Sequence, residues 1–443
     1  MENIPLNVKT ENDQEKKTRL RRVAAATVVG SMLEWYDFYL YAMMASIVFS
    51  KIFFNPNDEN AMIKSIATFT IGFLARPIGG IMFGWFGDRF GRKRMMIITF
   101  YLMGFCTVAI GLTPSYLTIG VWASVILIFL RICQGIAAGA ELAAAVVTSY
   151  EHADPKRRGS QSAWPALGLN LGLLLSSLTL YLLSLGGDEF LINGGWRIPF
   201  IMSFALVLVG VWVRNRLPET PEFTKTNTAE KKESTVSKSI FKELFTEHKR
   251  SLVVVFFVAA GYVALSYIFK TFSIAYLTEF KNSPAKVSSL AVTIASLFAI
   301  VVVPISGRLC DAYGSKKVIL VGGFISLLFA YPFMALLETG ESFWICVAIG
   351  IGTGFLAPLM FAAQGSFLSR QFPVHVRATG IGIAREIGTA IAGGFAPLLA
   401  LSLVKNSPTN SITGVVVILT IAAVIVIISA LSDQGRRFTT AIN

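Results

Sequence analysis

Charged side chains inside long apolar runs are the residues of this chain that could do chemistry. Four lie in its first half: Glu34, Asp37, Arg76 and Arg131. An ionised side chain near the middle of a bilayer costs about 2.5–3.5 kcal/mol, so each one requires a partner or a water-filled path. A carboxylate beside an arginine can exchange a proton, and an arginine can bind a solute carboxylate through two parallel hydrogen bonds. These residues therefore indicate proton transfer and recognition of a polar solute.

The depth of each charge suggests which residues pair. At a rise of roughly 1.5 Å per residue, Glu34 and Arg76 lie at one level, and Asp37 and Arg131 lie deeper at a second. We expect the pairs Glu34–Arg76 and Asp37–Arg131, although the exchanged pairing remains open. A purely structural role is the alternative, but a buried ion pair adds little stability because desolvation cancels most of its attraction. We assign to a proton and substrate pathway the residues Glu34, Asp37, Tyr41, Arg76, Arg131, Gln134, Asn170 and Lys270.

These charges must be positioned by membrane-spanning helices. Of the 443 residues, 54% are hydrophobic and 15% are charged, whereas a soluble domain carries about 25% charged residues. Apolar runs near the length that a helix needs to cross a bilayer recur throughout the chain. We predict an all-α polytopic membrane protein with twelve spans, near residues 23–50, 62–86, 95–112, 118–148, 160–185, 197–217, 251–278, 287–308, 318–337, 342–368, 379–403 and 412–432.

Lys and Arg gather in one set of alternate connections, which the positive-inside rule places in the cytoplasm. Both termini are then cytoplasmic. The longest polar stretch follows the sixth span and divides the chain in two. The predicted organisation is a cytoplasmic tail at 1–22, an N-terminal six-helix bundle at 23–217, a cytoplasmic linker at 218–250, a C-terminal six-helix bundle at 251–432 and a cytoplasmic tail at 433–443.

An internal repeat relates the two halves. Residues 84–94 and 307–317 share the pattern G-x-x-x-D-x-x-G followed by basic residues. Two related halves with a path at their interface suit alternating access. Asp88 and Asp311 can accept from backbone N–H groups at the start of a neighbouring helix, so each repeat can form a latch that breaks in one state. A basic topogenic loop alone needs neither the glycines nor the aspartate. We assign to the latch Gly84, Asp88, Gly91, Arg92, Glu141, Gly307, Asp311, Gly314, Arg385 and Glu386.

The second half carries fewer charges within its spans. Lys270 in span seven either faces an outer vestibule or extends its ammonium group to the interface, and the sequence leaves both open. Arg385 and Glu386 lie low in span eleven, so we place them in the inner gate rather than in the binding site.

Several function classes are disfavoured. The chain has no P-loop, zinc-type histidine motif or G-x-S-x-G elbow, which argues against an ATP-driven pump and an enzyme. Its net charge of +13 is spread in short bursts between apolar runs, which topology explains better than nucleic-acid binding. Composition does not exclude a channel or receptor, but the repeated latch favours secondary transport. The expected partners are a small solute, protons and membrane lipid, with no metal or cofactor, and we expect a monomer.

Several motifs resemble a known family. Residues 84–93 resemble the signature loop of the major facilitator superfamily, and residues 131–135 (RICQG) resemble its fourth-span motif. The segments EWYDF, ARPIGG, WRIPF and LPETPEF, which begin at Glu34, Ala75, Trp196 and Leu217, resemble the metabolite:proton symporter family. Such proteins take up citrate, oxoglutarate, shikimate, proline or betaine with protons. Where Gly-Gly-Glu is expected in span four, this chain reads Gly139-Ala140-Glu141, so substrate identity does not carry over.

The resemblance implies a major facilitator fold of two pseudo-symmetric six-helix bundles in a bacterial inner membrane. We predict proton-coupled symport of a small metabolite that bears a carboxylate or is zwitterionic. The alternative is proton-coupled export of an anionic or drug-like compound, because the same charged residues serve either direction.

Overall fold

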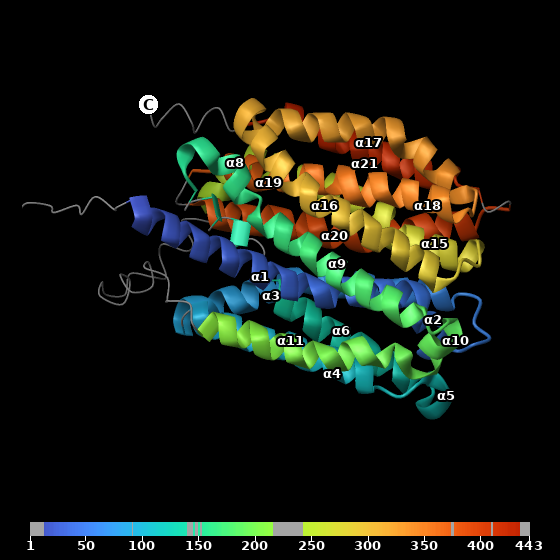
Figure 1. The fold of residues 1–443 in the computed structure, drawn as a ribbon. Helices are drawn as coiled ribbons and strands as arrows, with labels where there is room; N and C mark the ends of the chain where they lie inside the picture. The colour runs from blue at the N-terminus through green and yellow to red at the C-terminus, as the bar shows by residue number, and fades with distance from the viewer. Residues whose placement is uncertain are drawn as a thin grey trace, which may run out of the picture.

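The fold is known from a computed structural model, which describes residues 13–90, 92–139, 145–146, 149–150, 153–215, 242–373, 376–408 and 411–434. A few side chains inside these ranges are left out, among them those of residues 84–90 and 92–96. The regular structure of the described ranges is helical, and the long helices run side by side (Figure 1).

The described part of the first half contains six long helices and several short ones. The long helices are α1 (Asp13–Ile47), α3 (Ala61–Phe90), α4 (Arg92–Leu112), α6 (Trp122–Ala138), α9 (Trp164–Ser184) and α11 (Arg197–Asn215). The short ones are α2 (Phe49–Ile52), α5 (Tyr116–Ile119), η1 (Pro155–Arg157), α8 (Arg158–Ser162), α10 (Asp188–Phe190) and the π-helical turn η2 (Leu191–Gly195).

In the second half, the described residues form four uninterrupted long helices and two that are divided by π-helical turns. The uninterrupted ones are α16 (Ala285–Tyr313), α17 (Ser315–Glu338), α20 (Arg377–Lys405) and α21 (Thr413–Leu431). The divided ones are α14 (Lys249–Tyr267), η3 (Ile268–Phe272) and α15 (Ser273–Phe280), and then α18 (Ser342–Ile349), η4 (Gly350–Leu356) and α19 (Ala357–Ser369).

The described helices account for the predicted spans. By length and apolar composition, eight segments can each cross a membrane, and a ninth can if Asp188–Gly195 and Arg197–Gly210, which meet at a bend of 58°, form one span. The shorter apolar helices Ile97–Leu112 and Trp122–Ala138, together with α1, bring the described total to twelve. α1 begins at Asp13, before the predicted start of the first span, so the helix continues into the polar segment.

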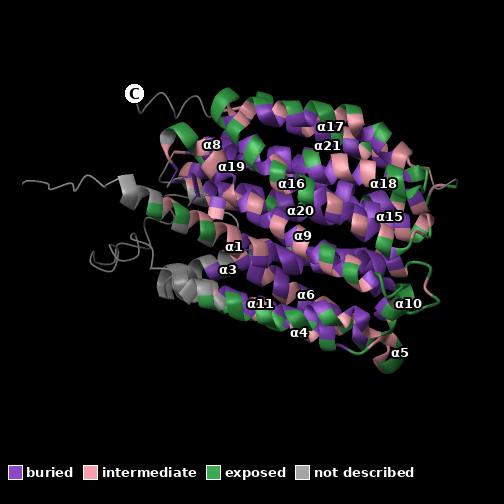
Figure 2. Ribbon diagram, viewed as in Figure 1, coloured by how far each residue is buried: buried purple, intermediate pink, exposed green. Residues whose placement is uncertain are grey.

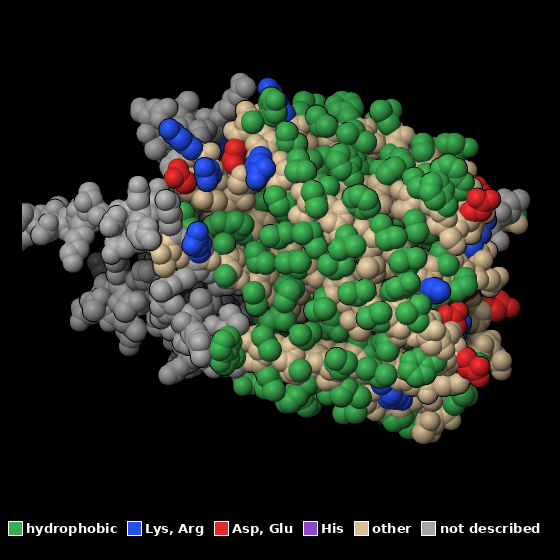
Figure 3. Space-filling view, in the orientation of Figure 1, with side chains coloured by type: hydrophobic (Ala, Val, Ile, Leu, Met, Phe, Trp, Pro, Cys, Tyr) green, Lys and Arg blue, Asp and Glu red, His purple; other side chains and the backbone are tan. Residues whose placement is uncertain are grey.

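The outer surface is suited to lipid. On the face shown in Figure 3, hydrophobic side chains cover the middle of the molecule and charged side chains gather at the two ends. Large apolar side chains such as Phe105, Phe298 and Leu328 are exposed, and a soluble protein rarely exposes a contiguous apolar surface of this kind. The parts of the helices that face neighbouring helices are mostly coloured as buried (Figure 2).

Glycines allow α3 and α6 to pack backbone to backbone. A Cβ on Gly79 would collide with the carbonyl of Ile136, and one on Gly135 would collide with the carbonyl of Gly72. Small residues permit such close approach of helices in membranes, where no water drives apolar surfaces together. This packing positions Arg76 and Arg131 on adjacent helices.

The two halves also touch along their interface. α16 packs against α9, and α20 packs against α3. Thr70 Oγ1 donates to the carbonyl of Gly394 at 2.7 Å, and Ser46 Oγ, near the end of α1, donates to the carbonyl of Thr271 at 3.3 Å. The two halves are therefore in direct contact at these positions.

Candidate functional site

The four charges singled out in the first half meet in the protein interior. α1 supplies Glu34 and Asp37, α3 supplies Arg76, and α6 supplies Arg131. Each of these side chains is 4% exposed or less. Because burial removes the hydration of a charge, the partners of each group decide what it can do.

Arg76 stands at the centre of an ionic network that joins the halves. Its Nη2 lies 3.5 Å from Oε1 of Glu34, and its Nε lies 3.4 Å from Oε2 of Glu386 on α20. Nη1 of Arg385 lies 2.7 Å from the other oxygen of Glu386. The predicted Glu34–Arg76 pair is thus confirmed. The bridge to Glu386 was not expected, and it connects a residue assigned to the pathway with two assigned to the gate.

The predicted direct pair of Asp37 and Arg131 is wrong. Among the described residues, these two are joined through a chain of neutral groups. Thr107 Oγ1 donates to Oδ2 of Asp37 at 3.1 Å, Gln134 Nε2 donates to Thr107 Oγ1 at 2.7 Å, and Arg131 Nη1 donates to Oε1 of Gln134 at 3.2 Å. Oδ1 of Asp37 has no hydrogen-bond partner in this part of the chain. The estimate of depth carried no information about the side chains between the two charges.

Aromatic rings surround Arg131. Its guanidinium carbon lies 4.1 Å from the ring centre of Tyr41, 4.5 Å from that of Phe38 and 5.4 Å from that of Phe69. A cation over an aromatic face is stabilised by the ring quadrupole. The Tyr41 hydroxyl donates to Thr68 Oγ1 at 2.6 Å, which fixes the ring beneath the guanidinium. Tyr41 and Gln134, both predicted for the pathway, therefore contact Arg131.

Lys270 lies in the protein interior, so extension to the interface is not what the structure shows. The side chain is 3% exposed, and its Nζ lies 4.0 Å from the ring centre of Tyr39 on α1. It belongs to η3, where the extra residue of a π-helical turn shifts the direction of the side chains. Asn170 is buried as well, but its Nδ2 donates to the carbonyl of Ala166 in its own helix at 2.8 Å.

The repeat of the second half makes the contact expected of a latch. Asp311 accepts from the backbone N–H of Gly159 at 2.6 Å, from that of Ser160 at 3.2 Å and from the Ser160 hydroxyl. A Cβ on Gly307 would lie 2.8 Å from Cα of Ser160, so glycine permits this approach. Gly314, with φ of 88°, allows the chain to turn between α16 and α17. We call this end of the molecule the latch end.

The remaining latch residues fall outside what the structure describes. These are Gly91 and Glu141, the side chains of Asp88 and Arg92, and the surroundings of Gly84, of which only the helical backbone is described. Their role in a latch stays a prediction.

Contacts between the halves also form at the opposite end. Asp188 Oδ1 accepts from the backbone N–H of Ala285, the first residue of α16, at 3.3 Å. Lys405 Nζ donates to the carbonyl of Glu59. Asp188 of the first half thus contacts the start of α16, and Asp311, near the end of α16, contacts the first half. The halves are held together at both ends.

Loosening the latch is expected to expose Cys310, which packs beside Gly159. In a chain whose other cysteines are replaced by serine, Asp311→Ala and Ser160→Ala should each raise the alkylation rate of Cys310 about fivefold, because losing a helix cap or one hydrogen bond costs about 1 kcal/mol. Ser160→Ala changes no charge, so it leaves the intrinsic reactivity of the thiol alone. Asp188→Ala removes the acceptor at the other end and should lower the rate. Equal rates in all variants would contradict a latch.

One participating residue and one contact were missed at the sequence level. Thr107 lies in an apolar run of span three, and Glu386 was placed in the gate without its contact to Arg76. A hydroxyl in a span is a weak signal because it can bond its own helix, as Thr107 Oγ1 also does with the carbonyl of Met103 at 2.9 Å.

Metal ligation is not supported at the centre of the described structure. Within the described ranges, His, Cys, Asp and Glu side chains come within 4.8 Å of one another in a group of three only at Glu243, Glu247 and His248, before α14. His248 there already lies 3.4 Å from Oε1 of Glu243.

Comparison with known proteins agrees with this architecture. The sequence matches the family described as sugar (and other) transporter over residues 23–441. The shikimate transporter of Escherichia coli (strain K12) is 32% identical over 416 residues, covering 93% of this chain and 94% of that protein. The inner membrane metabolite transport protein YhjE of the same organism is 35% identical over 392 residues, covering 87% of this chain and 88% of that protein.

Among solved structures, the fold is similar to that of XylE of E. coli, a major facilitator superfamily proton:xylose symporter bound to 6-bromo-6-deoxy-D-glucose. The TM-score is 0.73 at 16% identity, and the match covers 94% of this chain and 95% of that one. The likeness shows the fold alone. It confirms the predicted twelve-helix arrangement, and the family match confirms a transporter rather than an enzyme. The chain is a polytopic protein of the bacterial inner membrane that belongs to the sugar (and other) transporter family of the major facilitator superfamily.

Proposed function

We propose that this protein is a proton-coupled symporter of a small metabolite that bears a carboxylate or is zwitterionic. It works by alternating access as a monomer, with protons as the coupling ion and no cofactor. Both termini and the latch end face the cytoplasm, and the bundles at 23–217 and 251–432 rock about the path between them.

The buried charges carry this proposal. Within the described residues, three buried acids face four buried cations, which leaves one excess positive charge if all are ionised. Each of the seven is 5% exposed or less: Glu34, Asp37, Glu386, Arg76, Arg131, Lys270 and Arg385. The network around Arg76 balances itself, so the excess falls on Asp37, Arg131 and Lys270. A solute carboxylate would neutralise it, whereas a cationic solute would increase it.

The hydrogen-bonded chain between Asp37 and Arg131 offers a means of coupling. An ionised carboxylate can only accept hydrogen bonds, whereas a protonated one also donates. Protonation of Asp37 would allow the Thr107 hydroxyl to turn to the carbonyl of Met103, which it already approaches at 2.9 Å. Gln134 would keep its donation to Thr107. A proton at Asp37 and a solute at Arg131 therefore act on one connected set of groups.

Solute uptake into vesicles tests the proposal. Purified protein is reconstituted, and shikimate, citrate, proline, betaine and xylose are offered with and without an imposed proton gradient. A carboxylate or zwitterion should accumulate only with the gradient, and xylose should not. Accumulation that does not depend on the proton gradient, or preference for the sugar xylose, would contradict proton-coupled transport of a carboxylate.

Arg131 is the residue that we expect to bind the solute carboxylate. Arg131→Lys keeps the charge but loses the planar fork. Binding of the carboxylate identified in the vesicle assay should weaken by about 1–3 kcal/mol, as losing a charge-assisted hydrogen bond does. Arg76→Lys should weaken binding less, because Arg76 is engaged with two glutamates. Calorimetry on both purified variants at fixed pH checks the ranking, and a larger loss for Arg76→Lys would move the anchor to that residue.

A further inference from the structure

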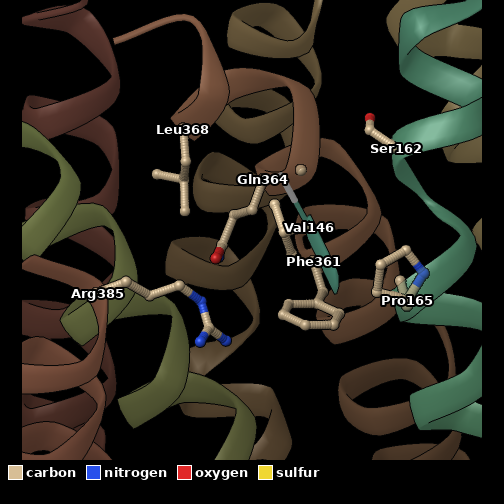
Figure 4. Close-up of a pocket in the computed structure, with 9 residues that line it drawn as sticks. Val146, Ser162, Pro165, Phe361, Gln364, Leu368 and Arg385 are labelled. Carbon is tan, nitrogen blue, oxygen red and sulfur yellow. The ribbon is translucent and has the colours of Figure 1, made fainter. Parts of the chain in front are cut away.

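A small cavity lies between the halves on the latch side of the charge network (Figure 4). Ser162 and Pro165 line it from the first half, and Gln364, Gly365 and Arg385 line it from the second. Its volume of about 10 Å³ is close to the space that one water molecule needs. Ser162 ends α8, the helix whose first residues bond Asp311.

The Gln364 side chain is the unusual feature of this cavity. It is 3% exposed, and neither its Oε1 nor its Nε2 has a hydrogen-bond partner among the described residues. Buried amides in proteins are nearly always hydrogen-bonded, so each exception requires an explanation such as a water or a ligand. Figure 4 shows its amide and the Arg385 guanidinium approaching the same space from two different helices.

Arg385 can accept a second anion. Its Nη1 donates to Oε1 of Glu386 at 2.7 Å, and a guanidinium carries five N–H donors in all. Arg385 and Gln364 together therefore offer several donors and one amide acceptor at the same cavity. An anion bound at Arg385 would compete with Glu386 for the guanidinium. Because Glu386 also contacts Arg76, this competition would affect the network between the halves.

We propose that Gln364 and Arg385 form a second polar site, distinct from Arg131, which binds the carboxylate of the solute while the latch end is open. The inference rests on the proposed function. The two walls of the cavity belong to different halves, so separation at the latch end widens it. The walls touch in the closed arrangement, because a Cβ on Gly365 would collide with the carbonyl of Ser162.

Anion preference at the cavity can be measured without knowing the solute. A chain without native cysteines receives Ser162→Cys and is labelled from the latch end in vesicles of both orientations. Two methanethiosulfonates are compared, one carrying a sulfonate and one a trimethylammonium group. The ratio of their rates cancels the reactivity of the thiol itself, so it reports the preference of the cavity for an anion.

The sulfonate reagent should react faster. Arg385→Gln should lower the ratio by about tenfold or more, as expected for losing a nearby buried charge, and Gln364→Leu by about three- to tenfold, as for one hydrogen bond. Ser366→Ala, on the same helix but bonded within it, should leave the ratio unchanged. If Arg385→Gln does not fold, Gln364→Glu adds a negative charge and should reverse the preference.

A ratio of labelling rates that stays the same in the Gln364 and Arg385 variants would overturn the second site. So would a Ser162→Cys protein that transports the solute but whose cysteine never reacts from the latch end. The vesicle uptake assay separates this failure from that of the proposed function. Uptake with an unchanged ratio rejects only the site, whereas the expected ratios without any proton-driven uptake support the anion site and reject symport.

Discussion

Asp37→Asn is expected to abolish proton-driven accumulation while leaving exchange intact. Among the described residues, Asp37 is the buried acid whose hydrogen bonds reach a cation through Thr107 and Gln134. A carboxyl group buried without an adjacent cation is less costly as a neutral acid than as an anion. Asparagine imitates that neutral acid in shape and can still accept from Thr107, but it cannot release a proton.

The measurement compares counterflow with accumulation under an imposed pH difference. With one proton per solute, a difference of one pH unit corresponds to about 1.4 kcal/mol and supports about tenfold accumulation. Asp37→Asn should reduce this to equal concentrations on both sides at a normal exchange rate. Asp58→Asn, in an exposed loop where Lys64 bonds the carboxylate, is the matched control and should accumulate normally. Full accumulation by Asp37→Asn would remove Asp37 from proton coupling.

Glu34 was the other candidate carboxylate in the sequence, and the structure separates the two. Glu34 pairs with Arg76 at 3.5 Å, so the negative charge of an ionised Glu34 is compensated. An ionised Asp37, by contrast, is in direct contact with no cation among the described residues. Depth along a helix follows from the fixed rise per residue, which is why the Glu34–Arg76 pair could be predicted. The direction of a side chain around the helix does not follow from depth, so the position of Thr107 and Gln134 between Asp37 and Arg131 was not predicted.

Helix breaks and contacts between halves were also beyond the sequence. The π-helical turn at Ile268–Phe272 shifts the 3.6-residue periodicity from which the buried face of a helix is predicted. The burial of Lys270 against Tyr39 could therefore not be derived. Gln364 is a single neutral amide in a strongly apolar run and leaves little trace in hydropathy. The contact between Arg76 and Glu386 joins residues far apart in the chain and depends on how the halves meet.

The twelve spans, by contrast, could be predicted well because each requires only a local property. A run of about twenty apolar residues between polar connections is sufficient evidence for a span. The latch aspartate of the second half, Asp311, was recognised from a repeat. It accepts from the backbone N–H groups of Gly159 and Ser160 at the start of α8, as an aspartate beside a helix start is expected to do.

The largest effect on stability is expected at Arg76. The side chain is 1% exposed and faces two glutamates, Glu34 on α1 and Glu386 on α20. Arg76→Gln removes the shared cation and leaves the network of Glu34, Glu386 and Arg385 with one excess negative charge in the protein interior. Breaking a buried ionic network from one side costs about 3–5 kcal/mol. Lys64→Gln, which removes a partly exposed pair with Asp58, should leave the stability almost unchanged, because ion pairs at the surface contribute little.

Adding Glu34→Gln to Arg76→Gln tests whether charge balance is the cause. The double variant restores neutrality in the network, so it should be more stable than Arg76→Gln alone by about 1–3 kcal/mol, the range of coupling energies between residues in contact. Equilibrium unfolding of the purified proteins in mixed micelles provides the comparison. If the two substitutions instead destabilise additively, the loss at Arg76 comes from its packing against Trp35, Phe38 and Phe73, whose ring centres lie 5.5–5.8 Å from the guanidinium carbon. Recovery of stability in the double variant would show that Arg76 holds the halves together through its charge. A proton or solute that changes the charge of this network could then shift the balance between closed and open arrangements.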